Sequence, residues 1–235
     1  MDPDTLALGP LWYVAFLLST TCHEASHALA AKLGGDPTAF HEGQVSLNPM
    51  PHIRREPFGM VLMPLLSFLT GGAMIGWASA PYDPYWQQRH PRRAAWMSLA
   101  GPAANLAIVI VAAILIRSGI AAGVFRPLPS ISFTHVVSGN GAALVDGGAV
   151  LLSIFFALNL LLACFNLLPV PPLDGYTALG VFTSERVALR LIDFARSAGA
   201  FALLGIVIAW YALDYVFDPV FIGALRLLYT GLLPV

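Results

Sequence analysis

Residues 8–31 read LGPLWYVAFLLSTTCHEASHALAA, with the motif HEASH at positions 23–27. Two histidines four residues apart lie on the same face of an α-helix, so the imidazoles of His23 and His27 can reach one metal ion. Glu24 lies beside them and can handle a proton. The stretch therefore predicts a helix that carries a metal site.

The surroundings of this motif are apolar. Residues 8–31 have about the length that spans a bilayer, and the histidines and the only acidic residue of the run all belong to the motif. Such residues at membrane depth are costly unless they are paired or metal-bound, so they usually mark a functional site. The pattern H-E-x-x-H is typical of zinc hydrolases. The sequence thus predicts a hydrolytic zinc site within a membrane.

The composition indicates an all-α polytopic membrane protein with about four to six transmembrane helices. Hydrophobic residues make up 57% of the chain and charged residues 11%, against about 25% charged in ordinary globular domains. The net charge of −1 provides no basic patch for nucleic acid. Cys22 and Cys164 both lie in apolar runs, which argues against a disulfide framework. The N-terminus lacks the basic region of a cleavable signal.

Further spans are expected at residues 94–117, 146–168 and 198 to about 216. The tail, residues 217–235, is apolar but interrupted by Pro219, which leaves open whether it crosses. Residues 57–77 would also pass as a span, but the uninterrupted helical part is only about 21 Å long. This segment is expected to dip into the membrane and return.

Two polar regions lie between the spans. Residues 38–56 alternate loosely and contain turn formers at Gly43 and Asn48-Pro49, which suggests a short membrane-associated β-hairpin. Residues 176–197 carry charges at roughly helical spacing, which predicts an amphipathic surface helix. His41 and His52 belong to the first region and are interpreted as loop histidines.

The distribution of cationic residues supports a re-entrant segment at 57–77. If that segment crossed fully, the cations would divide almost evenly between the two sides. If it is re-entrant, Arg117 and Arg126 lie alone on one side, apart from Arg226 in the tail. The other side then holds nine cations, namely Lys32, Arg54, Arg55, Arg89, Arg92, Arg93, Arg186, Arg190 and Arg196. The positive-inside rule makes this side cytoplasmic and places the N-terminus outside.

A second chemical stretch reads FNLLPVPPLDG at residues 165–175. Its three prolines cannot all continue a helix, so the backbone unwinds and presents Asp174. The histidines lie about 25 Å from the start of the first span. A re-entrant 57–77 makes this segment run parallel to the first span, so that Asp174 arrives near the depth of His23 and His27. The site is then expected nearer the cytoplasmic face.

Three motifs now occur in order along residues 8–176: HEASH at 23–27, GPAAN at 101–105, and the run from Asn166 to Gly175. Together they resemble the site-2 protease family of intramembrane zinc metalloproteases. The stretches GQVSLNPMPH and GWASAP are also similar to a compact prokaryotic branch that lacks PDZ and CBS domains. One departure is Arg54-Arg55, where this branch would carry an acidic residue.

The resemblance implies that His23, His27 and Asp174 ligate one Zn²⁺ per chain and that Glu24 is the general base. It also implies that Asn166 orients the substrate or stabilises the oxyanion.

The role of Asn105 is open, because helix packing explains this residue equally well.

The resemblance further implies one domain over residues 1–235, with a catalytic core at about 8–176.

The expected function is zinc-dependent hydrolysis of peptide bonds in or near transmembrane segments of membrane proteins. Its partners are the lipid bilayer and a transmembrane substrate, and the expected location is a prokaryotic plasma membrane. The edge of the 38–56 hairpin or the 73–81 return strand is expected to hold the substrate in extended form. A membrane metal-binding protein, a divalent-cation transporter and an inactive relative stay open as alternatives. The sequence makes no prediction about oligomeric state.

Overall fold

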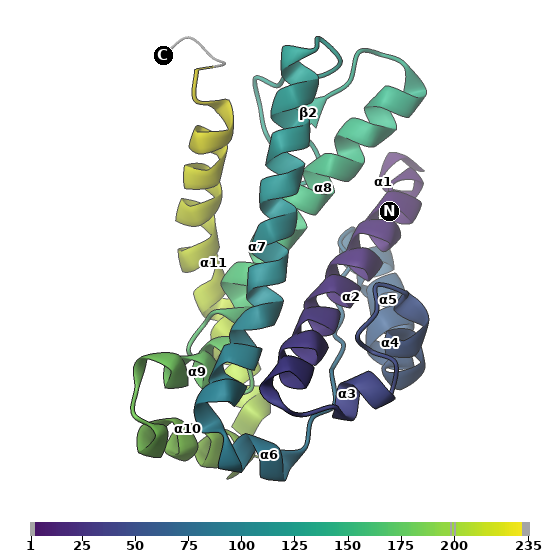
Figure 1. The fold of residues 1–235 in the computed structure, drawn as a ribbon. Coiled ribbons are helices and arrows are strands. Elements are labelled where there is room, and N and C mark those ends of the chain that lie inside the picture. Colours follow the sequence, from purple (N-terminus) through teal and green to yellow (C-terminus); the bar gives the residue numbers. More distant parts are fainter. Residues whose placement is uncertain (1–2, 198, 200, 232–235) are drawn as a thin grey trace.

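Four long helices dominate the computed structural model, which describes residues 3–197, 199 and 201–231 (Figure 1). They are α2 (Gly9–Gly34), α7 (Pro91–Ala121), α8 (Ala143–Asn166) and α11 (Phe201–Tyr229). Among the described residues, α7, α8 and α11 are long and apolar enough to cross a membrane. Helix α2 has 26 residues, or about 39 Å, but its polar motif lowers its hydropathy. The expected all-α membrane protein is confirmed.

Shorter elements connect and flank the long helices. They are α1 (Pro3–Ala7), α3 (Thr38–His41), α4 (Pro49–Arg55), the π-helix η1 (Phe58–Leu62), α5 (Met63–Gly71), α6 (Pro84–Arg89), β1 (Arg126–Pro127), β2 (Val137–Ser138), α9 (Asp174–Ala178), the 3₁₀-helix η2 (Leu179–Phe182) and α10 (Glu185–Ser197). Helix α10 has the expected amphipathic character, since Ala188 and Ile192 are buried while its charged residues are exposed.

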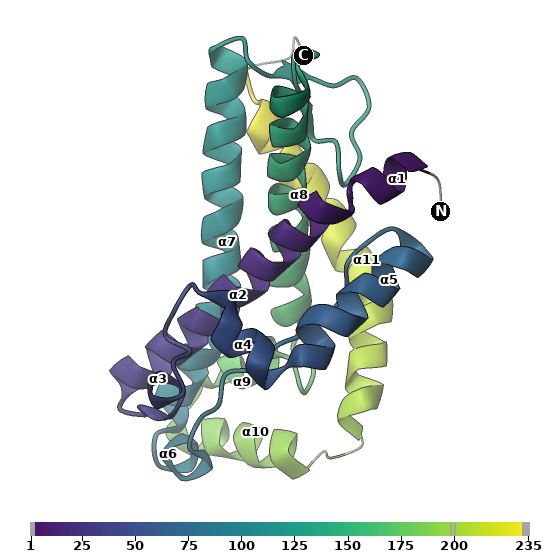
Figure 2. The same ribbon diagram turned by 90° about the vertical axis from the view of Figure 1, so that its right-hand side faces the viewer.

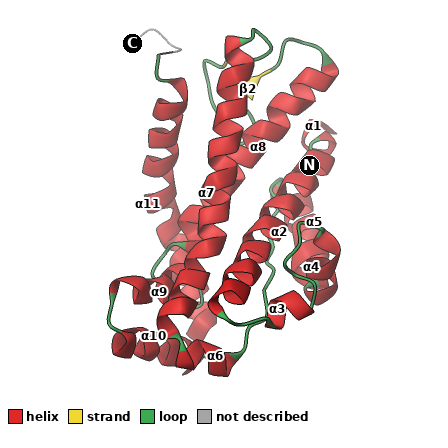
Figure 3. Cartoon of the chain, in the orientation of Figure 1, coloured by secondary structure: helices red, strands yellow, loops and turns green. Residues whose placement is uncertain are grey.

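The β-hairpin predicted for residues 38–56 is wrong. This region forms α3 and α4, and the one sheet of the described residues is the antiparallel pair β1–β2 between α7 and α8 (Figure 3). The Asn48 side chain accepts a hydrogen bond from Met50 N at 3.0 Å, and Pro49 follows as the first helical residue. Asn48-Pro49 is therefore a helix start rather than a hairpin turn, because both residue types suit either role.

Residues 57–77 form the expected re-entrant element. The chain runs along η1 and α5, reverses at Gly72 with φ of 75°, and returns without regular structure to α6 (Figure 2). The returning segment contacts η1, since Trp77 N donates a hydrogen bond to Gly59 O at 3.1 Å. A side chain at Gly59 would overlap the Trp77 carbonyl and one at Gly76 the Gly59 carbonyl, so the close approach requires both glycines.

The end of α2 and the start of α7 therefore lie at the same end of the bundle. The Gly34 carbonyl accepts hydrogen bonds from Trp86 Nε1 at 3.0 Å and from Arg93 at 3.1 Å. At the opposite end, the Arg117 guanidinium donates to the Leu228 carbonyl at 2.6 Å. The direction of each long helix thus alternates along the chain, as the distribution of cations predicts.

The tail continues the last span. Helix α11 runs through Pro219 as far as Tyr229, so an end of the span near residue 216 is wrong for the described part of the tail, which stops at residue 231. Phe217 and Phe221 stack with ring centroids 5.2 Å apart. Phe221 also packs against Phe156 of α8, and the centroids of these two rings lie 6.4 Å apart. This aromatic packing holds the helix together on both sides of the proline, a break that spanning helices tolerate.

Candidate metal centre

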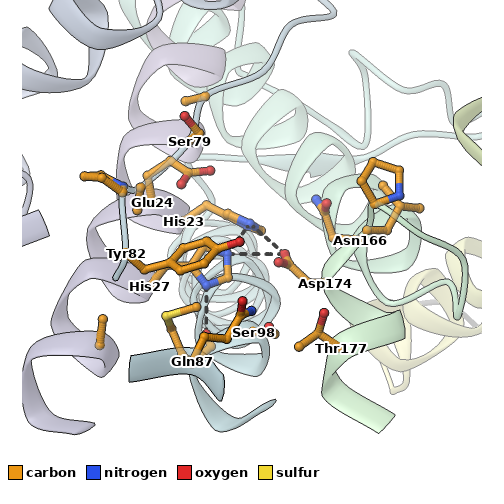
Figure 4. Close-up of a pocket in the computed structure, with 17 residues that line it drawn as sticks. His23, Glu24, His27, Ser79, Tyr82, Gln87, Ser98, Asn166, Asp174 and Thr177 are labelled. Atoms are coloured by element: carbon orange, nitrogen blue, oxygen red, sulfur yellow. Dashed lines mark hydrogen bonds and ion pairs between the residues drawn. The ribbon is translucent and has the colours of Figure 1, made fainter. Parts of the chain in front are cut away.

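Helix α2 places the two histidines of the HEASH motif on one face, one turn apart. Both are buried, and their Nε2 atoms lie 3.0 Å from each other (Figure 4). Glu24 is also buried, and each of the three residues offers a ligand atom within 4.8 Å of the other two. Among the described residues, this is the group of histidine and acidic side chains that could hold a metal ion.

Asp174 completes the cluster from a distant part of the chain. Helix α8 ends at Asn166, the proline-rich segment follows, and Asp174 begins α9. Its Oδ2 lies 3.1 Å from His23 Nε2 and 3.3 Å from His27 Nε2. Ligand atoms around a tetrahedral zinc with 2.0–2.1 Å bonds lie about 3.3 Å apart, so the three side chains fit a zinc ion. Zn²⁺ is the metal that this donor set and spacing indicate.

The imidazoles also favour the charged form of Asp174. Burial favours the neutral carboxyl, but the neighbouring His27 and His23 outweigh burial and hold the pKa of Asp174 below its usual value. The carboxylate form, which a metal ligand requires, is therefore the stable one at neutral pH.

Both histidines are oriented by hydrogen bonds at their other ring nitrogen. His23 Nδ1 lies 2.6 Å from Asn105 Oδ1, and His27 Nδ1 lies 2.8 Å from the Met97 carbonyl. Since both partners are acceptors, each Nδ1 carries the proton and each Nε2 is left free to bind a metal. Asn105, whose role the sequence left open, thus contacts a predicted ligand directly.

Asn105 is itself held by a row of buried polar side chains that was not predicted from the sequence. Its Nδ2 donates to Asn159 Oδ1 at 2.8 Å, and Asn159 Nδ2 donates to Ser19 Oγ at 2.8 Å. All three side chains are fully buried, and they link α7, α8 and α2. An asparagine in the apolar run of residues 146–168 was the signal available, because polar groups at membrane depth are expensive.

Asn105→Leu is expected to weaken zinc binding by about 10- to 100-fold, because His23 would lose the acceptor that fixes its tautomer and orientation. Competition of the purified protein with a zinc chelator measures this affinity. The matched control is Asn140→Leu, at an exposed loop asparagine, which should bind zinc as the wild type does. Equal affinity in both variants would contradict the orienting role of Asn105.

A cavity of about 290 Å³ opens beside the cluster. Its lining includes His23, Glu24, His27 and Asp174, together with Asn166 and residues 78–82 of the returning strand (Figure 4). Asn166 Nδ2 donates to the Leu162 carbonyl at 3.0 Å.

The two histidines of the 38–56 region lie elsewhere. His41 and His52 do not line the cavity, and His52 Nε2 lies 3.2 Å from the Ser46 carbonyl. Their interpretation as loop histidines is wrong, because His41 lies in α3 and His52 in α4.

Comparison with known families gives a match over most of the chain, since residues 11–210 fit the family described as peptidase family M50. The chain belongs to peptidase family M50. The expectation of a zinc metalloprotease is therefore confirmed at the level of the family. The alternative of a cation transporter is not favoured, because the family is one of peptidases.

Several bacterial relatives resemble this M50 peptidase. "Putative zinc metalloprotease YwhC" of Bacillus subtilis (strain 168) is 33% identical over 200 residues, which cover 85% of this chain and 80% of the relative. "Putative zinc metalloprotease Rip2" of Mycolicibacterium smegmatis (strain ATCC 700084 / mc(2)155) is 30% identical over 180 residues, which cover 73% of this chain and 60% of the relative. Rip2 of Mycobacterium tuberculosis (strain ATCC 25618 / H37Rv) is 32% identical over 164 residues, 70% of this chain and 54% of the relative. This chain thus matches less than two thirds of either mycobacterial protein. No solved structure matches it significantly.

Proposed function

We propose that this M50 peptidase is an intramembrane zinc endopeptidase that hydrolyses peptide bonds in or near transmembrane segments of membrane proteins. The observation that carries this proposal is the position of the cluster: His23 and His27 lie in a helix of bilayer-spanning length, among apolar helices, and line a cavity with Glu24. A site in that position can reach a peptide bond at membrane depth.

His23, His27 and Asp174 would hold one zinc ion per chain and leave a coordination position open. When bound there, zinc would polarise the scissile carbonyl and make a water molecule more acidic. The proton transfers are proposed for Glu24. This residue is 7% exposed and lines the cavity, and its carboxylate makes no hydrogen bond within the described residues. Its carboxylate takes the proton of the attacking water and delivers it to the leaving amine.

Asn166 is proposed to stabilise the oxyanion. It lines the same cavity, and its amide donates only to a carbonyl of its own helix, Leu162 O, at 3.0 Å. Rotation of the side chain would direct the amide to the developing charge, an interaction worth about 3 kcal/mol at comparable sites.

The returning strand at residues 78–81 is proposed to capture the substrate. A transmembrane helix must unwind before its amides can react, and an extended edge offers hydrogen bonds to the unwound chain. Within the described part of the chain, no backbone group of residues 78–81 is hydrogen-bonded to another backbone group. The strand is held in place by Ser79, whose Oγ donates to Glu56 Oε1 at 2.5 Å and accepts from Arg55 Nε at 3.3 Å. The other candidate, a hairpin at 38–56, falls away because that region is helical.

We further propose a single domain over residues 1–235, since the elements around the cavity lie within its predicted core at about 8–176. The protein is an integral membrane protein, and we place it in a prokaryotic plasma membrane with the N-terminus outside. The relatives are bacterial, and the predicted excess of cations lies at the end of the bundle that holds the end of α2. The site is then nearer the cytoplasmic face.

The test is cleavage of a model transmembrane substrate by the purified protein in detergent, with the cut position mapped by mass spectrometry. The expected result is a cut in or next to the transmembrane segment that a zinc chelator abolishes and added Zn²⁺ restores. A soluble peptide that contains only the flanking sequence is the control and should stay intact. Cleavage of the control alone, or cleavage that resists the chelator, would contradict the proposal.

A further inference from the structure

Gln87 of α6 presents an unpaired carboxamide in the wall of the site cavity. The residue is 6% exposed, its Oε1 is shielded from solvent without a hydrogen-bond partner, and its Nε2 makes no hydrogen bond within the described residues. The next residue, Gln88, is exposed and donates to Asp193 Oδ1 at 3.4 Å. A buried amide is costly without a partner, so one left unpaired in a binding cavity indicates a group supplied by a ligand.

Two hydroxyl groups line the same cavity. Ser98 of α7 is 5% exposed, and its Oγ donates to the Ala94 carbonyl at 3.2 Å, which leaves its lone pairs free to accept. The Thr177 hydroxyl on α9 makes no hydrogen bond within the described residues. In Figure 4, Gln87, Ser98 and Thr177 lie on the opposite side of the histidines from Ser79. Three helices thus contribute polar groups to one wall of a cavity within an apolar protein.

We infer that Gln87, Ser98 and Thr177 form a subsite for a small hydrogen-bonding side chain of the substrate, such as threonine, within two residues of the scissile bond. The inference rests on the proposed function. A substrate held in extended form by residues 78–81 projects successive side chains to opposite sides, so one of them faces this wall. A carboxamide both donates and accepts, as a hydroxyl does, whereas an apolar side chain of the same shape would leave Gln87 unpaired.

An isosteric scan of the substrate tests the subsite. Threonine and valine have nearly the same shape, so each position within two residues of the cut is made first Thr and then Val. The wild type is expected to show about tenfold higher kcat/KM for Thr than for Val at one position, the effect of one neutral hydrogen bond. Gln87→Leu should remove this preference, while the matched control Gln88→Leu should keep it.

The pattern of results separates reading of the substrate from other roles. A wild type that never distinguishes Thr from Val overturns the inference, whether or not Gln87→Leu folds. So does a Gln87→Leu protein, with normal zinc content, that slows both substrates equally, because a structural or solvent-path role would act on both alike.

Binding keeps failure of the subsite distinct from failure of the proposed function. The Kd of the Thr peptide for the Glu24→Gln protein should be about tenfold lower than that of the Val peptide. If the wild type cuts nothing but this difference in Kd persists, the proposed function is wrong and the subsite stands. Equal Kd values overturn the subsite.

Discussion

Glu24→Gln is expected to abolish peptide cleavage and to leave one zinc ion bound per chain. The side chain keeps its size, and the proposed ligands His23, His27 and Asp174 are unchanged, so the metal site should persist. Glutamine cannot accept the proton of the attacking water, and loss of a general base lowers rates by about 10²- to 10⁴-fold. Metal analysis of the purified protein and cleavage of the model transmembrane substrate measure the two effects separately.

The control for this variant is His27→Ala, which should lose both zinc and cleavage because it removes a proposed ligand. Zinc retained in Glu24→Gln together with full cleavage would show that another group takes the proton. Loss of zinc from Glu24→Gln would instead identify Glu24 as a ligand, and the roles proposed for Glu24 and Asp174 would have to be revised.

The residues of the cluster could be predicted because each lies in a local pattern. The four-residue spacing of His23 and His27 fixes a shared helix face, and the prolines before Asp174 force the backbone to unwind at that point. The distribution of cations indicated the direction of each long helix and so placed the two segments at one depth. The resemblance to the site-2 protease family implied the ligand role of Asp174. The structure brings Asp174 Oδ2 within 3.3 Å of both histidines.

Other features depend on contacts that no local pattern encodes. Asn159 meets Asn105 and Ser19, which lie 54 and 140 residues away along the chain, so their hydrogen bonds depend on how three helices pack. Asn48-Pro49 fits both a turn and a helix start, and only the surrounding packing decides between them. Gln87 lies in a short helix with no apolar period to reveal which of two adjacent glutamines is buried.

Close contact between α2 and α7 positions the metal site, and it depends on Gly101. Small residues such as Gly101 let another helix approach closely. The structure shows that the neighbouring atoms are the imidazoles themselves, since a side chain at Gly101 would overlap the Nε2 atoms of His23 and His27. The backbone of α7 therefore packs against the metal-binding nitrogens. The same helix supplies the Asn105 and Met97 acceptors.

Gly101→Ala is accordingly expected to abolish zinc binding and cleavage, although it changes none of the proposed ligands. The added methyl group meets both proposed metal-binding nitrogens, so at least one imidazole must move from its position or α7 must shift. Overpacking of this kind also lowers the free energy of unfolding by about 1–3 kcal/mol. Zinc content, cleavage and thermal unfolding of the purified variant measure the effect. The matched control is Gly223→Ala in α11, where a methyl group has no neighbour within 4 Å and all three properties should match the wild type. A Gly101→Ala protein with one zinc per chain and normal cleavage would show that α7 can retreat without disturbing the ligands, and the backbone of α7 would then have no part in holding the metal site.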